Sequence, residues 1–174
     1  MEKNANIIPG FDIRYTELTD GKSLKKWLLD PTIGRWFPMN DEVEIEDATG
    51  RWVGFCRYKC SLTAVIDGAP VGIATLYLQP YKKIAHQCEF GIIVADEHRG
   101  KGVGSALIKN LMHLAKNNFN IELLHLQVYE GNPATRLYER FGFKEFGIQK
   151  RWIKETDGEG NPFYVGRVFM ETFL

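Results

Sequence analysis

The chain has 174 residues, of which 44% are apolar and 25% are charged, as is usual for a globular protein that folds in water. This length suits one domain over residues 1–174. Its 22 basic residues balance its 22 acidic residues, so nucleic acid is not an expected partner. Residues 1–10 lack the apolar run of a signal peptide, and no segment has the roughly 20 apolar residues that span a bilayer. We therefore expect a cytoplasmic protein without a membrane partner.

The N-terminal part is predicted to form a strand, a short helix and a loop. Residues 11–18 alternate apolar and polar side chains, which indicates a half-buried strand. A helix capped by Asp20 or Ser23 would end before Pro31, because the residue before a proline avoids the helical conformation. The aromatic residues 32–39 are then expected to form a loop.

A second helix is predicted to start at Asn40, its N-cap, and to bury Trp52. Five carboxylates lie in its first turns: Asp41, Glu42, Glu44, Glu46 and Asp47. Acidic residues at a helix start complement the helix dipole, and the same charges would also attract a cationic amine. We favour a solvated acidic helix start over an amine site.

Residues 89–108 carry the strongest functional signal. An apolar strand is followed by a polar turn, by glycines at positions 100, 102 and 104, and by a helical pattern that runs to about Asn118. The first N–H groups of a helix lack internal partners and lie at the positive end of its dipole. Glycine leaves these groups open to a ligand, so the stretch predicts a seat for a pyrophosphate or similar anion. Arg99 and Lys101 add positive charge.

The spacing of these glycines excludes two common nucleotide loops. The dinucleotide fingerprint fails because its third glycine position is Leu107 or Ser105, and the P-loop fails because Lys101 precedes a glycine. A nucleotide-binding α/β domain is therefore disfavoured. The pattern Arg-x-x-Gly-x-Gly at residues 99–104 instead resembles the pyrophosphate loop of the GCN5-related N-acetyltransferase (GNAT) superfamily, which binds acetyl-coenzyme A. A plain glycine-rich turn with two solvated bases is the alternative.

A second segment, residues 132–143, strengthens the resemblance. Asn132 is expected to cap a short helix, Pro133 to occupy its first position and Gly142 to end it. Its pattern, Asn-x-x-Ala/Arg-x-x-Leu-Tyr closing on Gly-Phe, is similar to the second signature segment of the same superfamily.

The remaining elements complete the expected fold. Strands are predicted for residues 61–67, 71–78 and 123–128, for a central strand that begins near Ala85, and for a C-terminal hairpin of residues 147–154 and 163–172. The order matches the GNAT acyl-coenzyme A N-acyltransferase fold, an α/β class with a mixed seven-stranded sheet and about four helices on both faces.

The resemblance implies transfer of an acetyl group from acetyl-coenzyme A, the acyl donor, to a primary amine by direct attack in a ternary complex. Glu89 would be the catalytic base, directly or through water, and Tyr138 the acid at the thioester sulfur. His125 is a second candidate base. A solvent-facing or lysine-paired Glu89 and a purely packing Tyr138 are the structural alternatives. A coenzyme-binding GNAT-fold sensor without turnover is the alternative function.

The resemblance also places the ligands. Backbone N–H groups of Ile92, Ile93 and Val94, at a bulge assisted by Gly91, would hold the thioester carbonyl. Asn132 would contact the pantetheine arm or only cap its helix. The pyrophosphate would bind Arg99, Gly100, Lys101, Gly102, Val103, Gly104 and Ser105.

The acceptor would be an amine-bearing small molecule or peptide, held near Trp36, Phe37, Trp152 and Tyr164. The chain would act as a monomer or homodimer. No metal is expected, because the histidines are scattered, and Cys56, Cys60 and Cys88 form no C-x-x-C pair. We interpret the cysteines as reduced, partly buried thiols.

Overall fold

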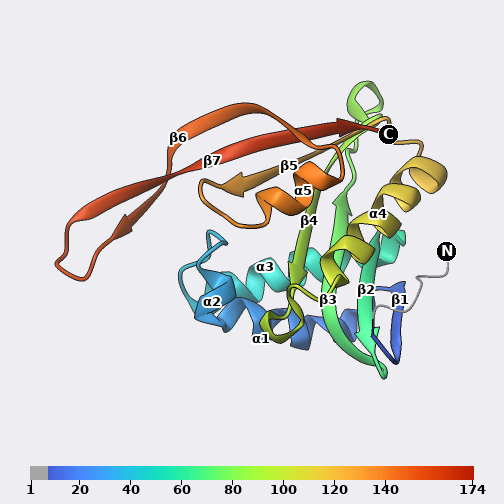
Figure 1. Ribbon diagram of the computed structural model, residues 1–174, viewed down its shortest axis with the longest axis horizontal. Helices are drawn as coiled ribbons and strands as arrows, with labels where there is room; N and C mark the ends of the chain where they lie inside the picture. The colour runs from blue at the N-terminus through green and yellow to red at the C-terminus, as the bar shows by residue number, and fades with distance from the viewer. Residues whose placement is uncertain (1–7) are drawn as a thin grey trace.

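A computed structural model describes residues 8–174 (Figure 1). The expectation of a chain without a signal peptide rests mainly on residues 1–7, which lie outside the described part. Within residues 8–174 no helix combines the length and the apolar character needed to cross a bilayer.

The core of the fold is a seven-stranded mixed sheet in the order β1-β2-β3-β4-β5-β7-β6. The strands are β1 (Phe11–Tyr15), β2 (Ser61–Ile66), β3 (Ala69–Tyr77), β4 (Gln87–Val94), β5 (Leu123–Tyr129), β6 (Lys144–Thr156) and β7 (Pro162–Phe173). Neighbouring strands are antiparallel except β4 and β5, which are parallel. The expected mixed α/β sheet is confirmed.

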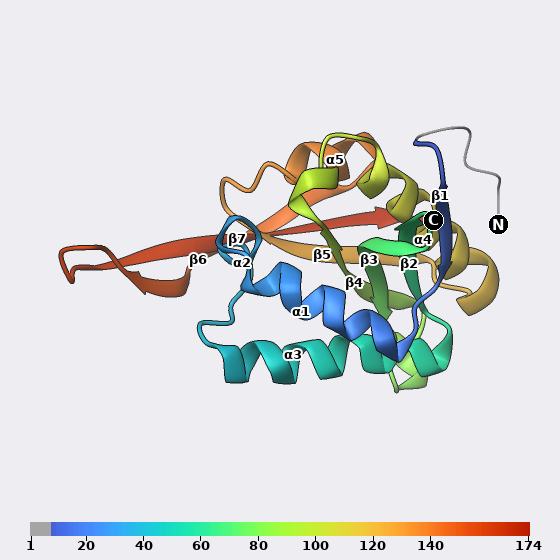
Figure 2. The ribbon, with the colours of Figure 1, turned by 90° about the horizontal axis from the view of Figure 1, so that it is seen from below.

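Helices cover both faces of this sheet (Figure 2). The helices are α1 (Gly21–Leu29), α2 (Pro31–Gly34), α3 (Glu42–Gly54), α4 (Val103–Phe119) and α5 (Thr135–Arg140). The apolar faces of α4 and α5, with Leu107, Leu111 and Tyr138, pack in one buried cluster. Leu24 of α1 and Trp52 of α3 pack with Ile73 of the sheet in a second cluster. The sheet therefore separates two apolar cores.

Helix α2 corrects the predicted aromatic loop, so residues 8–174 contain five α-helices and not four. The Asp30 side chain accepts a hydrogen bond from the N–H of Thr32 at 2.9 Å, and Pro31 occupies the first turn. Asp30 and Pro31, which end α1, thus also start α2. A proline is unfavourable inside a helix but favourable in its first turn.

Two of the predicted caps lie slightly elsewhere. The N-cap of α3 is Asp41 and not Asn40, since the Asp41 side chain accepts from the N–H of Glu44 at 2.9 Å. Asn132 accepts from the N–H of Ala134 in a turn that precedes α5, so it does not cap the helix directly. Gly142 ends α5 as predicted, with a positive φ of 86°.

A buried polar row runs from the residue after β1 across β2 to β3, beneath α1 and α3. The indole N–H of Trp52 donates to one end of the row at 2.9 Å, and Asp20 accepts at the other end at 2.8 Å. Arg14 covers the Asp20 carboxylate with two hydrogen bonds of 2.8 Å. Four hydroxyls form the row, in the order Thr75, Ser61, Thr16 and Thr63, with oxygen separations of 2.5, 2.8 and 2.9 Å. We call these four residues the hydroxyl row.

The last two strands extend beyond the body as a long two-stranded arm (Figures 1 and 2). The ladder between β6 and β7 shifts register between Gln149 and Ile153, where Arg151 has a positive φ of 57°. Residues 154–163, at the tip of the arm, are all exposed. The base of β7 remains inside the sheet next to β5.

Candidate active site

The site lies where β4 and β5 separate. Their parallel ladder ends at the pair of Glu89 and His125, while β4 continues to Val94 beside β3 alone. Alternate N–H and C=O groups on the β5 side of β4 therefore lose their strand partners and face the gap.

The bulge expected at residues 92–94 is not found in the ladder between β3 and β4. That ladder runs without a register shift from Tyr77 and Glu89 to Gly72 and Val94. The gap opens because β5 diverges from β4. The divergence of β5 leaves main-chain groups of β4 without a strand partner, as a bulge would. Free N–H groups in residues 92–94 therefore do not require a bulge.

A cleft of about 660 Å³ opens into this gap. Of the predicted site residues, those that line it are Tyr138, Ile92, Ile93, Val94, Arg99, Gly100, Gly102, Gly104, Ser105 and Asn132. Of the four residues expected near the acceptor, Trp36 and Phe37 line the cleft, whereas Trp152 and Tyr164 do not. Glu89, Lys101 and Val103 are not part of the lining.

The glycine loop leaves space over the start of α4. Gly100 and Gly102 have positive φ values of 70° and 88°, which side-chain-bearing residues rarely adopt. A Cβ atom at Gly100 would meet no other protein atom within 4 Å. The first N–H groups of α4 and this free space fit the pyrophosphate of acetyl-coenzyme A.

Cationic side chains surround the loop. Arg99 lines the cleft and pairs with Asp96 at 3.4 Å. Arg136 and Arg140 of α5 also line the cleft, and our sequence prediction missed them. Their spacing of four residues, which places both on one helix face, was the available signal. Together the two arginines add positive charge to the cleft beyond that of Arg99 and Lys101.

Tyr138 is both a core residue and a cleft residue. Its ring packs edge-on against Phe90 and Phe143 at centroid distances of 6.1 Å each, and only 7% of the residue is exposed. Burial raises the pKa of the Tyr138 phenol above its ordinary value, so the phenol keeps its proton at neutral pH. The two interpretations of this residue are thus compatible.

Glu89 contacts the cleft through one neighbour. The side-chain amide of Gln127, which lines the cleft, donates to Glu89 Oε1 at 2.8 Å. No lysine forms an ion pair with Glu89 among residues 8–174. The carboxylate is therefore held in position while its charge remains uncompensated.

His125 is less suited to be the base. It does not line the cleft, and its ring Nε2 is hydrogen-bonded to Gln87 Oε1. Burial lowers the pKa of the His125 imidazole, although the nearby Glu89 and Glu171 act in the opposite direction. Glu89 is hydrogen-bonded to the cleft residue Gln127, whereas the hydrogen-bond partner of His125, Gln87, does not line the cleft, so Glu89 remains the better candidate.

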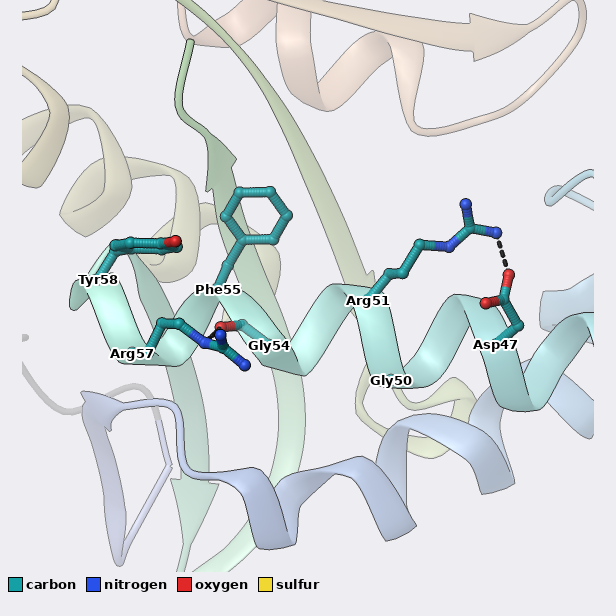
Figure 3. Close-up of a pocket in the computed structure, with 7 residues that line it drawn as sticks. All are labelled: Asp47, Gly50, Arg51, Gly54, Phe55, Arg57 and Tyr58. Atoms are coloured by element: carbon teal, nitrogen blue, oxygen red, sulfur yellow. Dashed lines mark hydrogen bonds and ion pairs between the residues drawn. The ribbon is translucent and has the colours of Figure 1, made fainter. Parts of the chain in front are cut away.

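The acidic start of α3 is engaged elsewhere. Lys25 pairs with Glu42 at 3.0 Å and with Glu46 at 2.6 Å, and none of the five acids lines the cleft. Asp47 pairs with Arg51 beside a separate shallow hollow on the surface of α3 (Figure 3). The structure thus agrees with a solvated acidic helix start.

The cysteines are free thiols. Burial raises the pKa of Cys60 to about 11 and that of Cys88 to about 12, so both stay protonated. Residues 8–174 contain no group of side chains arranged to hold a metal ion.

Comparison with known proteins agrees with this geometry. Residues 21–143 match the model of the acetyltransferase (GNAT) family, and this is well over half of the chain. The chain therefore belongs to the GNAT family, as the two sequence segments predict.

Relatives and solved structures share the fold. The L-amino acid N-acetyltransferase AaaT of Escherichia coli (strain K12) is 31% identical over 108 residues, which are 62% of this chain and 67% of that protein. A ribosomal-protein-alanine N-acetyltransferase from Brucella melitensis superposes with a TM-score of 0.75 at 24% identity, over 94% of this chain and 99% of that chain. The structure of yncA from Salmonella typhimurium with its cofactor acetyl-CoA has a TM-score of 0.76 at 17% identity. The match covers 95% of this chain and 94% of that chain.

Proposed function

We propose that residues 1–174 form one domain that transfers the acetyl group of acetyl-coenzyme A to a primary amine by direct attack in a ternary complex. One observation carries the proposal. The gap between β4 and β5 brings the glycine loop, Tyr138 and the Gln127 partner of Glu89 into one cleft. Acetyl-coenzyme A would supply the thioester, whose carbonyl carbon is the electrophile.

The side chains have complementary tasks. Glu89, acting directly or through water, accepts a proton from the acceptor ammonium, which is mostly protonated at neutral pH and cannot attack in that form. The free N–H groups of residues 92–94 stabilise the negative charge that develops on the carbonyl oxygen. Tyr138 donates its proton to the departing sulfur. The new C–N bond replaces the C–S bond. The second proton lost by the nitrogen restores Tyr138, and Glu89 releases the first proton to solvent, so one proton is released for each acetyl group transferred.

The coenzyme side rests on the loop of residues 99–105 with Arg136 and Arg140. The N–H groups at the start of α4 would receive the pyrophosphate, and the arginines would neutralise the phosphate charge. Asn132 uses its side-chain oxygen in the turn before α5, so its amide nitrogen is the group left for the pantetheine arm.

The test begins with calorimetric titration of the whole protein with acetyl-coenzyme A, with ATP and NAD as controls. We expect saturable binding of acetyl-coenzyme A alone. Release of free thiol is then measured over amines, amino acids, polyamines and peptides. No binding of acetyl-coenzyme A to the folded protein would refute the proposal, and binding without turnover of any amine would identify a sensor.

Glu89→Gln tests the base. The amide keeps the size of the side chain but cannot accept the proton, so we expect kcat to fall about 100-fold or more. The Kd for acetyl-coenzyme A should stay within about twofold. Glu122→Gln, which changes an exposed glutamate outside the cleft, is the matched control. Unchanged turnover in Glu89→Gln would remove Glu89 from the mechanism.

A further inference from the structure

Arg167 of β7 lies beside the candidate active site. Its Nη1 donates to the side-chain oxygen of Gln127, a cleft residue, and its Nε donates to Gln149 Oε1 at 2.9 Å. The guanidinium carbon lies 3.5 Å from the ring centroid of Trp152 and 4.7 Å from that of Phe169. The cation is thus held by two amides and two aromatic rings in one orientation.

This guanidinium has no carboxylate partner among residues 8–174, although it is only partly exposed. Some other cations do have such partners: Arg14 pairs with Asp20, and Lys150 pairs with Glu130. The Nη2 group of Arg167 also has no hydrogen-bond partner there. A fixed, partly desolvated cation with free donors is suited to bind an anion.

Arg167 and Glu89 are joined through a single side chain. Gln127 donates to Glu89 through its nitrogen and accepts from Arg167 through its oxygen. The Glu89 carboxylate and the Arg167 guanidinium are separated by one hydrogen bond, one amide group and a second hydrogen bond. The distance between the two charged groups is therefore at most about 8 Å. A zwitterion with charges about 3 Å apart, and a hydrogen bond of about 3 Å at each end, spans up to about 9 Å and bridges this separation when the three segments are not collinear.

A second unpartnered polar group lies on the same sheet face. Tyr129 is the cross-strand partner of Arg167, and paired residues project side by side. The residue is only 7% exposed, and its hydroxyl has no hydrogen-bond partner. Its ring packs edge-on against Trp36, which lines the cleft. A buried hydroxyl without a partner favours a ligand that supplies one.

We propose that the acceptor is a free α-amino acid whose carboxylate binds Arg167, with Tyr129 as a second donor, while its amine faces Glu89. This assignment rests on the proposed function and names its substrate class. A polyamine would place a further positive charge against Arg167, and a peptide N-terminus lacks the adjacent carboxylate. The amino acid satisfies both charged groups.

The first experiment compares matched acceptors with the unmodified protein. Thiol release is measured with L-leucine, L-leucinamide and 3-methylbutylamine, and likewise for the methionine, phenylalanine and glutamine series. We expect at least one side chain for which kcat/KM of the acid exceeds that of the amide and of the amine by tenfold or more, because the deleted contact is a charge-assisted pair.

Variants then locate the contact. In Arg167→Met we expect kcat/KM for the acid to fall about 10- to 100-fold, mainly through KM, and that for the amide to change by less than about twofold. Arg167→Lys should recover part of the loss, since it restores the charge without the planar donor set. Arg151→Met is the matched control, because that arginine stacks on Tyr164 of the arm and does not contact the cleft lining.

The possible results separate this inference from the proposed function. Equal kcat/KM for acids and amides, or a preference for spermidine or a tetrapeptide, overturns the carboxylate assignment and leaves the acetyltransferase standing. Turnover of no amine, despite bound acetyl-coenzyme A, overturns both. The comparison of acceptors needs no variant, so an Arg167→Met protein that fails to fold does not prevent a decision.

Discussion

Tyr138 shows how one residue can serve the core and the chemistry. Tyr138→Phe keeps the ring between Phe90 and Phe143, so the thermal midpoint should change by less than about 2 °C. Without the phenol the departing sulfur loses its proton donor, and we expect kcat to fall about 10- to 100-fold at unchanged Kd for acetyl-coenzyme A. Tyr58→Phe, at an exposed position, is the control.

The pH dependence of the same reaction gives an independent check. Burial raises the pKa of Tyr138 above its ordinary value of 10, so the acid form persists at every pH below that value. We therefore expect that titration of Tyr138 causes no fall in kcat between pH 8 and about pH 10. Any fall in that range should be the same in Tyr138→Phe. An alkaline limb near pH 8.5 that disappears in the Phe variant would contradict this assignment.

Asp20 makes stability depend on pH. Burial alone would raise the pKa of its carboxyl, but hydrogen bonds from Arg14, from the Glu17 backbone and from Thr63 outweigh burial and lower it. A lowered folded pKa adds stability above the unfolded value of about 3.9, and this contribution is lost as the pH falls through the folded pKa.

Asp20→Asn should lower the free energy of unfolding at pH 7 by about 2–3 kcal/mol, because it leaves Arg14 without its charged partner. The difference from the unmodified protein should shrink as the pH falls below about 4. Denaturant titrations at pH 7, 5 and 3.5 measure it, with the exposed Asp12→Asn as control. A difference that grows toward low pH would have the wrong sign.

Individual site residues were predictable where the signal is local. Arg99, Gly100 and Tyr138 sit in short segments whose spacing carries their meaning. The contacts of Glu89 with Gln127 and of Gln127 with Arg167 join residues 38 and 40 positions apart. Those contacts depend on strand order, which no local pattern encodes.

Helix α3 contains a glycine, Gly50, at a position with open space around it. A Cβ atom at Gly50 would meet nothing within 4 Å, and the residue lies beside the hollow of Figure 3. Gly50→Ala should raise the free energy of unfolding by about 0.5–1 kcal/mol through helix propensity. Denaturant titration measures the gain, and acetyl-coenzyme A binding should be unchanged.

Gly72→Ala provides the contrast within a strand. Its Cβ would lie 3.0 Å from the carbonyl oxygen of Ile93 and from a methyl group of Leu107. We expect a loss of about 1–3 kcal/mol, since a packed backbone cannot move aside easily. A gain of stability in this variant would show that the core there is looser than these distances imply.

Most elements were predictable because periodicity and caps agree along the chain. The exceptions have local causes. Helix α2 differs from the predicted loop because Pro31, which ends α1, is also a favourable first residue of the next helix. The last two strands, Lys144–Thr156 and Pro162–Phe173, are longer than predicted because pairing continues at their ends into exposed residues that carry no burial pattern.

For the whole molecule, the arm is separable from the body. Residues 154–163 are exposed, so replacing residues 155–163 with Asn-Gly should leave a closed hairpin between Lys154 and its cross-strand partner Tyr164. We expect the thermal midpoint to change by less than about 2 °C. A fall above 5 °C, together with a change in sedimentation, would show that a second copy covers the tip.

The overall architecture follows from the alternation of strands and helices, and the coenzyme side follows from two contiguous segments. The acceptor side could not be derived in the same way. It combines the chain around α2 with β4, β5 and β7, which are brought together only by the final order of the sheet. The proposed acceptor specificity thus depends on long-range contacts, whereas the proposed coenzyme site depends on local sequence.

The hydroxyl row has one further property. An indole N–H can only donate and an ionised carboxylate can only accept, while each hydroxyl carries one hydrogen. When all three contacts within the row are hydrogen bonds, every hydroxyl hydrogen is oriented toward Asp20, because Thr63 donates to that carboxylate. Ser61 also lies 3.4 Å from the carbonyl oxygen of Ala74, an acceptor outside the row. The row is a line of aligned dipoles, and protonation of Asp20 would remove the acceptor that orders it. A solvent-accessible ion pair at Arg14 is in this way connected to Trp52, whose ring packs against Tyr77 and Phe37 near the cleft.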